Sequence, residues 1–177
     1  MTTSILLDGD NLRIINRTND WFWKMSPSDW EWLSTHKFGS PIKERKIYCN
    51  TSNVESSRQI APFGDAGWDI IHTPVLTSEG KCATDGYIFL AMMDALHDSS
   101  ITNIILGTGD HDFLPVIRRV AERKNVIVVT PAKPSRLFSQ VADVMSLQNV
   151  AERQYGRRVN GVGPFTQVFN AIVGSNK

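Results

Sequence analysis

Cysteine is almost absent from this chain, which has only Cys49 and Cys82 among 177 residues. The two thiols lie far apart and neither belongs to a C-x-x-C pair, so the sequence indicates neither a disulfide framework nor a zinc site. Reduced thiols are typical of proteins in the cytoplasm, and we expect that location here.

Long apolar runs and an excess of charge of one sign are also missing. The first residues, MTTSILLDGD, reach acidic side chains too soon for a signal-peptide core, and no apolar run approaches the ~20 residues of a membrane span. With 19 Lys+Arg against 18 Asp+Glu, the net charge of +1 creates no global attraction to nucleic acid or to an anionic membrane. We therefore expect no membrane partner, and any attraction to nucleic acid must be local.

Short apolar runs rich in β-branched residues are present, and they alternate with segments of helical period. Runs that are apolar nearly throughout are typical of parallel strands covered on both faces, and alternation with helices favours the same class. The chain length suits one domain, and we predict it over residues 1–158, followed by a tail at 159–177 that is loosely docked or binds a partner. The predicted strands are residues 4–8, 45–50, 68–73, 103–108 and 125–130.

Four helices are predicted between or after these strands. Residues 85–97 place apolar side chains on one stripe, and Pro115 falls in the first turn of a helix that begins near Asp112. Residues 26–38 start with Ser26 as N-cap and proline at the next position. Residues 134–147 are predicted to form a helix whose core-facing side chains are Leu137, Val141 and Val144.

Carboxylates are concentrated where predicted strands end. Asp8 closes the first strand, Asp110 and Asp112 follow the fourth, and Asp85 opens the helix after the third. The carboxyl ends of parallel strands share one edge, where ligands of doubly wound sheets bind. Grouped carboxylates repel one another unless a cation neutralises them, and oxygen-only ligands select a hard ion, Mg²⁺ or Mn²⁺.

Each of these motifs also fits a purely local role. The stretch Asp-Gly-Asp-Asn after the first strand is a common turn sequence. In Gly-Thr-Gly-Asp-His-Asp-Phe, Asp112 is suitably placed to cap the following helix, and His111 is expected to point outward rather than to catalyse. Neither stretch fits a calcium-binding loop, because both lack the glycine at the sixth position and the glutamate at the twelfth position that such a loop requires.

Taken together, ILLDGDNL, KCATDGYIFLAMMDAL and IILGTGDHDFLPVIRRV resemble the signature motifs of the NYN family of PIN-like nucleases, over about residues 4–130. The resemblance implies a three-layer α/β/α sandwich with a central, mainly parallel sheet of about five strands, and metal-dependent endoribonuclease activity, mainly on single-stranded RNA. It implies that the catalytic and metal-binding acids are Asp8, Asp85, Asp110 and Asp112, with Asn11 and Thr108 as neighbouring polar groups. One departure is that three residues, rather than the usual two, separate Lys81 from Asp85.

Basic residues are unevenly distributed, and a local positive strip occupies residues 113–136. Its cations are Arg118, Arg119, Arg123, Lys124, Lys133 and Arg136, against Glu122 alone. The strip is either a nucleic-acid contact, which would be salt-sensitive, or an ordinary solvated helix face. The expected nucleic-acid contacts are Lys81, Arg118, Lys133 and Arg136.

A second compositional feature is a tryptophan-rich segment near the N-terminus. Tryptophan stacks on unpaired bases, but burial in a core or a subunit contact is its commoner use. We therefore expect a homodimer or a protein partner to use this segment or the tail, and we keep the tryptophans out of the predicted site. The segment contains Trp21, Trp23, Trp30 and Trp32.

Two other functions stay open at this stage. A haloacid-dehalogenase-type phosphatase also places two aspartates around one residue after a strand, which would make Asp8 the nucleophile and Asp10 the acid. That family normally continues with Gly-Thr, whereas this chain has Asn11 and Leu12. The other alternative is a non-catalytic RNA-binding module of the same fold, which the presence of all four acids disfavours.

Overall fold

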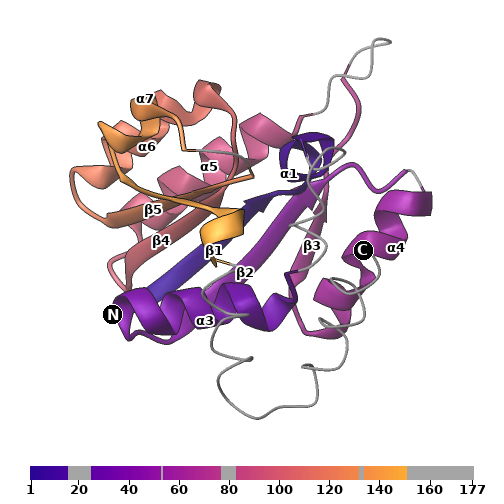
Figure 1. Cartoon of the computed structure of the whole chain (residues 1–177), viewed down its shortest axis with the longest axis horizontal. Helices are drawn as coiled ribbons and strands as arrows, with labels where there is room; N and C mark the ends of the chain where they lie inside the picture. The colour runs from indigo at the N-terminus through magenta and orange to yellow at the C-terminus, as the bar shows by residue number, and fades with distance from the viewer. Residues whose placement is uncertain (16–24, 53, 77–82, 132–133, 151–177) are drawn as a thin grey trace, which may run out of the picture.

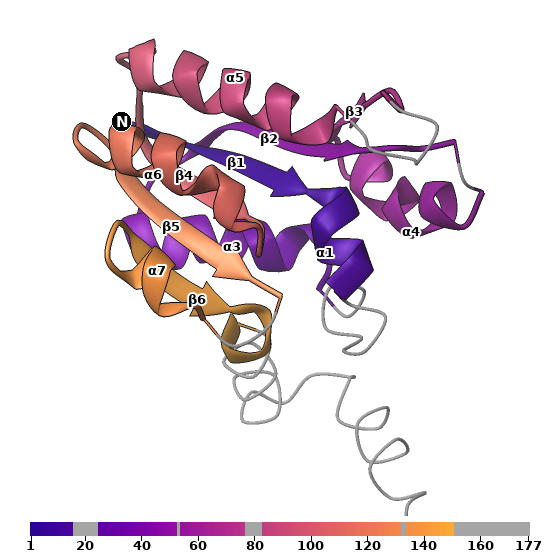
Figure 2. The same cartoon turned by 90° about the horizontal axis from the view of Figure 1, so that it is seen from above.

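A parallel sheet of six strands lies at the centre of the molecule, with helices on both faces (Figures 1 and 2). The computed structural model describes residues 1–15, 25–52, 54–76, 83–131 and 134–150. The sheet has the order β3-β2-β1-β4-β5-β6, and every neighbouring pair is parallel. The predicted α/β/α sandwich is confirmed, with one strand more than expected.

The strands are β1 (Thr2–Asp8), β2 (Ile42–Cys49), β3 (Asp69–His72), β4 (Ile101–Gly107), β5 (Asn125–Thr130) and β6 (Asp143–Ser146). The helices are α1 (Gly9–Ile15), α3 (Pro27–Phe38), α4 (Val54–Asp65), α5 (Thr84–His97), α6 (Leu114–Ala121) and α7 (Arg136–Ser139). A 3-10 turn, η1 (His111–Phe113), precedes α6.

Two apolar clusters, one on each face of the sheet, form the core. Side chains of α3 and α4 pack on one face, and those of α5 and α6 pack on the other. Figure 2 shows α5 and α3 on opposite sides of the sheet. Because β1 and β4 are covered on both faces, Ile5, Leu6 and Leu7 have no exposed surface, and the same is true of Ile104 and Ile105. This explains why the central residues of these two strands form continuous apolar runs.

Gly107, the last residue of β4, allows α3 to pack closely against the sheet. A Cβ atom at this position would lie 2.8 Å from Leu7 Cδ2 and 3.1 Å from the ring of Trp30. Trp30 is fully buried as a result.

The predicted start of α3 is confirmed as well, because Asp29 accepts a hydrogen bond from the backbone N–H of Ser26 at 2.8 Å.

The predicted helix at 134–147 is wrong. Helix α7 covers only Arg136–Ser139, and the chain then forms the edge strand β6, in which Val144 pairs with Val128 of β5, before a helical turn begins at Leu147. Leu137, expected to face the core, is 49% exposed. The run Val-Ala-Asp-Val-Met has an apolar spacing that fits either element, and pairing with the free edge of β5 decides it.

Two helices were not predicted, and several predictions lie outside the described residues. The first turn of α1 consists of turn-forming residues, and α4 contains Pro62. The predicted tail at 159–177, its boundary and two of the tryptophans, Trp21 and Trp23, lie outside the described part of the chain. Among the described helices, none is long and apolar enough to cross a bilayer.

Candidate active site at the reversal of strand order

The polar groups after β1 and β4 lie where the order of the sheet reverses. From β1 the chain proceeds outward through β2 and β3, and from β4 it proceeds in the other direction through β5 and β6. Ligands of such sheets bind outside the carboxyl ends of these two strands. Asp8 is the last residue of β1, and Thr108 follows β4 directly, so both stand at this edge. Figure 1 shows that β1 leads directly into α1 at the same edge.

Asp8 is buried, with 2% of its surface exposed, and both of its carboxylate oxygens accept hydrogen bonds. Oδ1 accepts from the backbone N–H of Asn11 at 2.9 Å, and Oδ2 accepts from the hydroxyl of Thr108 at 3.0 Å. The pKa of Asp8 is nevertheless raised to about 7, chiefly by burial and to a smaller extent by the nearby charges of Asp85 and Asp10. The surroundings of the Asp8 carboxylate therefore favour binding of a proton or another cation.

A short hydrogen-bonded network extends from Asp8 to the loop after β4. The side-chain oxygen of Asn11 accepts from the backbone N–H of Gly109 at 2.8 Å, and the Thr108 hydroxyl accepts from the N–H of Asp110 at 3.2 Å. Asp110 in turn accepts from the N–H of Asp112 at 2.9 Å and so caps η1. The structure therefore places Asn11, Thr108 and Asp110 in one network with Asp8.

The four predicted acids do not have equal positions in this network. Asp85, in the first turn of α5, is close enough for its charge to raise the pKa of Asp8. Asp110 is partly buried and lies two residues beyond Thr108. Asp112 is exposed, and its link to the network is the backbone N–H that Asp110 binds. The charge of Asp85 thus acts on Asp8, while Asp112 lies at the solvent-exposed rim.

Asp10 also belongs to this site, although it is not among the predicted metal ligands. Its carboxylate accepts from the backbone N–H of Asn50 at 3.1 Å and from the hydroxyl of Thr84 at 2.7 Å. Gly9 makes this approach possible, because a Cβ atom there would lie 3.0 Å from Cys49 Cβ. Asp10 therefore fixes the end of β2 and the start of α5, the helix that carries Asp85.

The carboxylates are gathered at one edge, but they do not converge on one point. Within the part of the chain that the structure describes, no three Asp, Glu, His or Cys side chains are grouped closely enough to hold an ion. The metal-ligand set of Asp8, Asp85, Asp110 and Asp112 therefore stays a prediction. The donors nevertheless fit a hard cation in their chemistry: all are oxygens, and none of the described groups that shift the pKa of Asp8 is cationic.

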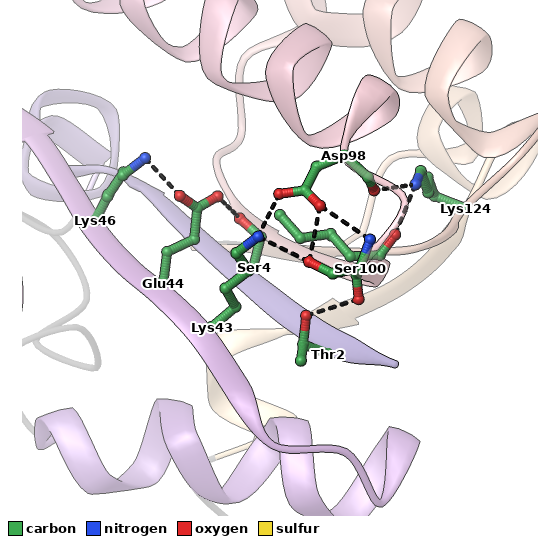
Figure 3. Close-up of polar contacts among 9 residues, drawn as sticks. Thr2, Ser4, Lys43, Glu44, Lys46, Asp98, Ser100 and Lys124 are labelled. Atoms are coloured by element: carbon green, nitrogen blue, oxygen red, sulfur yellow. Dashed lines mark hydrogen bonds and ion pairs between the residues drawn. The ribbon is translucent and has the colours of Figure 1, made fainter.

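Part of the predicted positive strip lies at the edge of the sheet opposite the site. Arg123 and Lys124 follow α6 and line a hollow of about 790 Å³ at the edge opposite the site, and Arg119 pairs with Glu122. The Lys124 ammonium donates to the carbonyls of Asp98 and Ile101, in the polar cluster that Figure 3 shows around Asp98. Lys124 thus holds the turn from α5 to β4.

The remaining predicted contacts are only partly described. Arg118 on α6 and Arg136 at the start of α7 are exposed. Lys81 and Lys133 lie outside the described residues. Of the tryptophan-rich segment, Trp30 and Trp32 are described: Trp30 is in the core and Trp32 stacks on His36, with ring centroids 4.4 Å apart.

Comparison with known proteins identifies the domain type. The sequence model of the NYN domain matches residues 2–148. Among solved structures, a protein of unknown function from Vibrio parahaemolyticus is similar in fold, with 20% identity, coverage of 84% of this chain and 94% of that chain, and a TM-score of 0.63. Homoserine dehydrogenase from S. aureus overlays with 14% identity over 86% of this chain and 30% of that chain, but its TM-score of 0.36 carries no structural argument. No protein of curated function matches the chain.

Proposed function

Because this chain belongs to the NYN domain family, whose members are generally ribonuclease-like, we propose that it is a metal-dependent endoribonuclease acting on mainly single-stranded RNA. The observation that carries the proposal is the buried carboxylate of Asp8 where the strand order reverses, whose pKa is raised first by burial and then by the charges of Asp85 and Asp10. Carboxylates gathered at a ligand-binding edge favour a cation there, and a phosphodiester substrate is then attracted to that cation.

In this proposal, Asp8, Asp85 and Asp110 hold the ion, and Asp112 lies at the solvent side where substrate approaches. A bound Mg²⁺ or Mn²⁺ supplies charge neutralisation at the phosphate and lowers the pKa of a bound water. Asn11 and Thr108 orient the Asp8 carboxylate through their hydrogen bonds to its two oxygens. Asp10 positions Thr84, and with it the first turn of α5, rather than meeting the substrate.

The phosphatase alternative requires Asp10 to donate a proton to a leaving group. Both oxygens of Asp10 instead accept hydrogen bonds, from Asn50 and Thr84. An acid catalyst needs a protonated oxygen directed at its substrate. The contacts of Asp10 therefore support a positioning role and favour the nuclease over the phosphatase.

The test is cleavage of a labelled single-stranded RNA with Mn²⁺ or Mg²⁺, run beside hydrolysis of a small phosphomonoester. We expect RNA cleavage that chelation removes and that Asp8→Asn and Asp110→Asn each reduce at least ~100-fold. Asp143→Asn, which changes an exposed carboxylate at the start of β6, is the matched control and should retain activity.

Two results would contradict the proposal. Phosphomonoester hydrolysis that Asp10→Asn abolishes, without RNA cleavage, would favour the phosphatase. Salt-sensitive RNA binding by the unmodified protein, with no cleavage in either metal, would favour the non-catalytic module.

A further inference from the structure

An exposed aromatic ring stands between two of the proposed site acids. His111 is the first residue of η1, between Asp110 and Asp112, and it is exposed to solvent. Its imidazole stacks on the ring of Phe138 in α7, with centroids 5.0 Å apart and an angle of 22° between the planes. Phe138 itself is fully buried. One face of the imidazole is therefore covered, and the other face is open to solvent.

The position of this ring is fixed by both its backbone and its side-chain contacts. Asp110 caps η1 by accepting from the N–H of Asp112, which holds the backbone on both sides of His111. The ring rests on Phe138, which belongs to the same apolar cluster as Phe113. An exposed ring that is already ordered loses little conformational entropy when a planar group packs on it. This makes His111 suited to binding a flat ligand.

Residues next to Phe138 add further features of a nucleotide subsite. Arg136 opens α7 and is exposed, and Leu137 is 49% exposed. The N-cap of this short helix is Ser135, whose hydroxyl accepts from the N–H of Leu137 at 3.2 Å. A cation within two residues of the stacked pair suits a phosphate, as aromatic and basic side chains commonly combine on single strands.

We propose that the open face of His111 is a stacking site for one unpaired base of the substrate strand, adjacent to the carboxylates. The inference rests on the proposed function, because it concerns the same substrate. It assigns His111 to substrate positioning rather than to proton transfer. Since every base has a planar face, the contact orders the strand at the site without selecting a sequence.

The experiment measures RNA binding in the Asp8→Asn background, which prevents cleavage. Two fluorescent probes of equal length and charge are compared: an oligoadenylate, and an oligomer of the same backbone whose sugars carry no bases. We expect His111→Ala to weaken binding of the oligoadenylate roughly 5- to 150-fold, the range for loss of one base stack. Binding of the abasic oligomer should stay unchanged, because it has no base to stack.

Two further variants separate stacking from other effects. His111→Phe keeps a flat ring without ring nitrogens, so it should restore oligoadenylate binding. His36→Ala is the matched control, because His36 is also an exposed imidazole stacked on an aromatic ring, Trp32, in the last turn of α3. It should bind both probes as the Asp8→Asn parent does. Thermal unfolding of each variant should show a folded protein.

The remaining outcomes contradict either the stacking site alone or the proposed function as well. Equal losses on both probes, no loss on either, or failure of His111→Phe to restore binding would overturn the stacking site. If the unmodified protein cleaves RNA while His111→Ala binds normally, only this inference fails. If the Asp8→Asn parent binds no RNA and the unmodified protein cleaves none, the proposed function fails together with the inference.

Discussion

At the scale of single residues, Asp8 has the unusual position of a buried carboxylate at the end of a central strand. The pKa of Asp8 is raised to about 7 by burial first, and then by Asp85 and Asp10. Between its ordinary value of 3.8 and about 7, the folded metal-free protein holds a proton that the unfolded chain has released. Protonation therefore favours the fold, and stability falls as pH rises through this window.

The first prediction follows from this linkage. In the presence of a chelator, the free energy of unfolding of the unmodified protein should fall between about pH 4 and pH 7 relative to that of Asp8→Asn, which has no proton to lose at this position. Urea unfolding of both proteins across this range measures the difference. An identical pH dependence of the two proteins would show that Asp8 titrates normally and would remove its proposed role.

Thr108 provides a second prediction at the same scale. Its hydroxyl donates to Asp8 and accepts from the N–H of Asp110, so Thr108→Val removes the link between two proposed ligands. We expect the affinity for Mn²⁺ to fall roughly 10- to 100-fold, as for other groups that orient metal ligands. Titration calorimetry with Mn²⁺ is the measurement.

Thr3→Val is the control for that change. Thr3 is a buried threonine at the other end of β1, where its hydroxyl bonds to Ser40. It should lose a similar amount of stability but bind Mn²⁺ as the unmodified protein does. Equal loss of affinity in both variants would mean that Thr108 acts only through stability.

At the scale of secondary-structure elements, α3 packs closely against the sheet because Gly107 has no side chain. Gly107→Ala would bring a Cβ atom within 2.8 Å of Leu7 and 3.1 Å of Trp30, both fully buried. We predict destabilisation of ~1–3 kcal/mol, the usual cost of overpacking a core. Gly86→Ala, in α5 with no atom within 4 Å of the added group, should be neutral or slightly stabilising. Denaturant unfolding of both variants tests the pair, and a harmless Gly107→Ala would contradict the packing described here.

Some helices and strands could be predicted from the sequence, and others could not. Strands β1 and β4 were predictable because burial on both faces leaves runs that are apolar throughout, and α5 because its apolar stripe is regular. β6 was not predictable, since its short apolar pattern suits a helix equally well and the free edge of β5 decides the outcome. Asp10 was missed for a related reason: its partners, Asn50 and Thr84, are distant in sequence.

At the scale of the whole molecule, the net charge of +1 gives no general attraction for RNA. Binding must depend on where the cations lie, and the fold separates Arg136 at the start of α7 from Arg123 at the opposite edge. We predict that Arg136→Ala lowers the slope of log affinity against log salt by about 0.7, the value for one phosphate contact on a single strand. Arg123→Ala should leave the slope unchanged. Equal effects of both variants would show that the positive strip acts as a whole.

The most direct test of the central claim is the position of a bound ion. The account predicts that a crystal soaked in Mn²⁺ gives an anomalous difference peak beside Asp8, between the ends of β1 and β4, with Asp85 and Asp110 moved to share it. The same soak of Asp8→Asn should give no peak there. Density elsewhere on the molecule, or an equal peak in both proteins, would contradict the assignment of this edge as the metal centre of a nuclease.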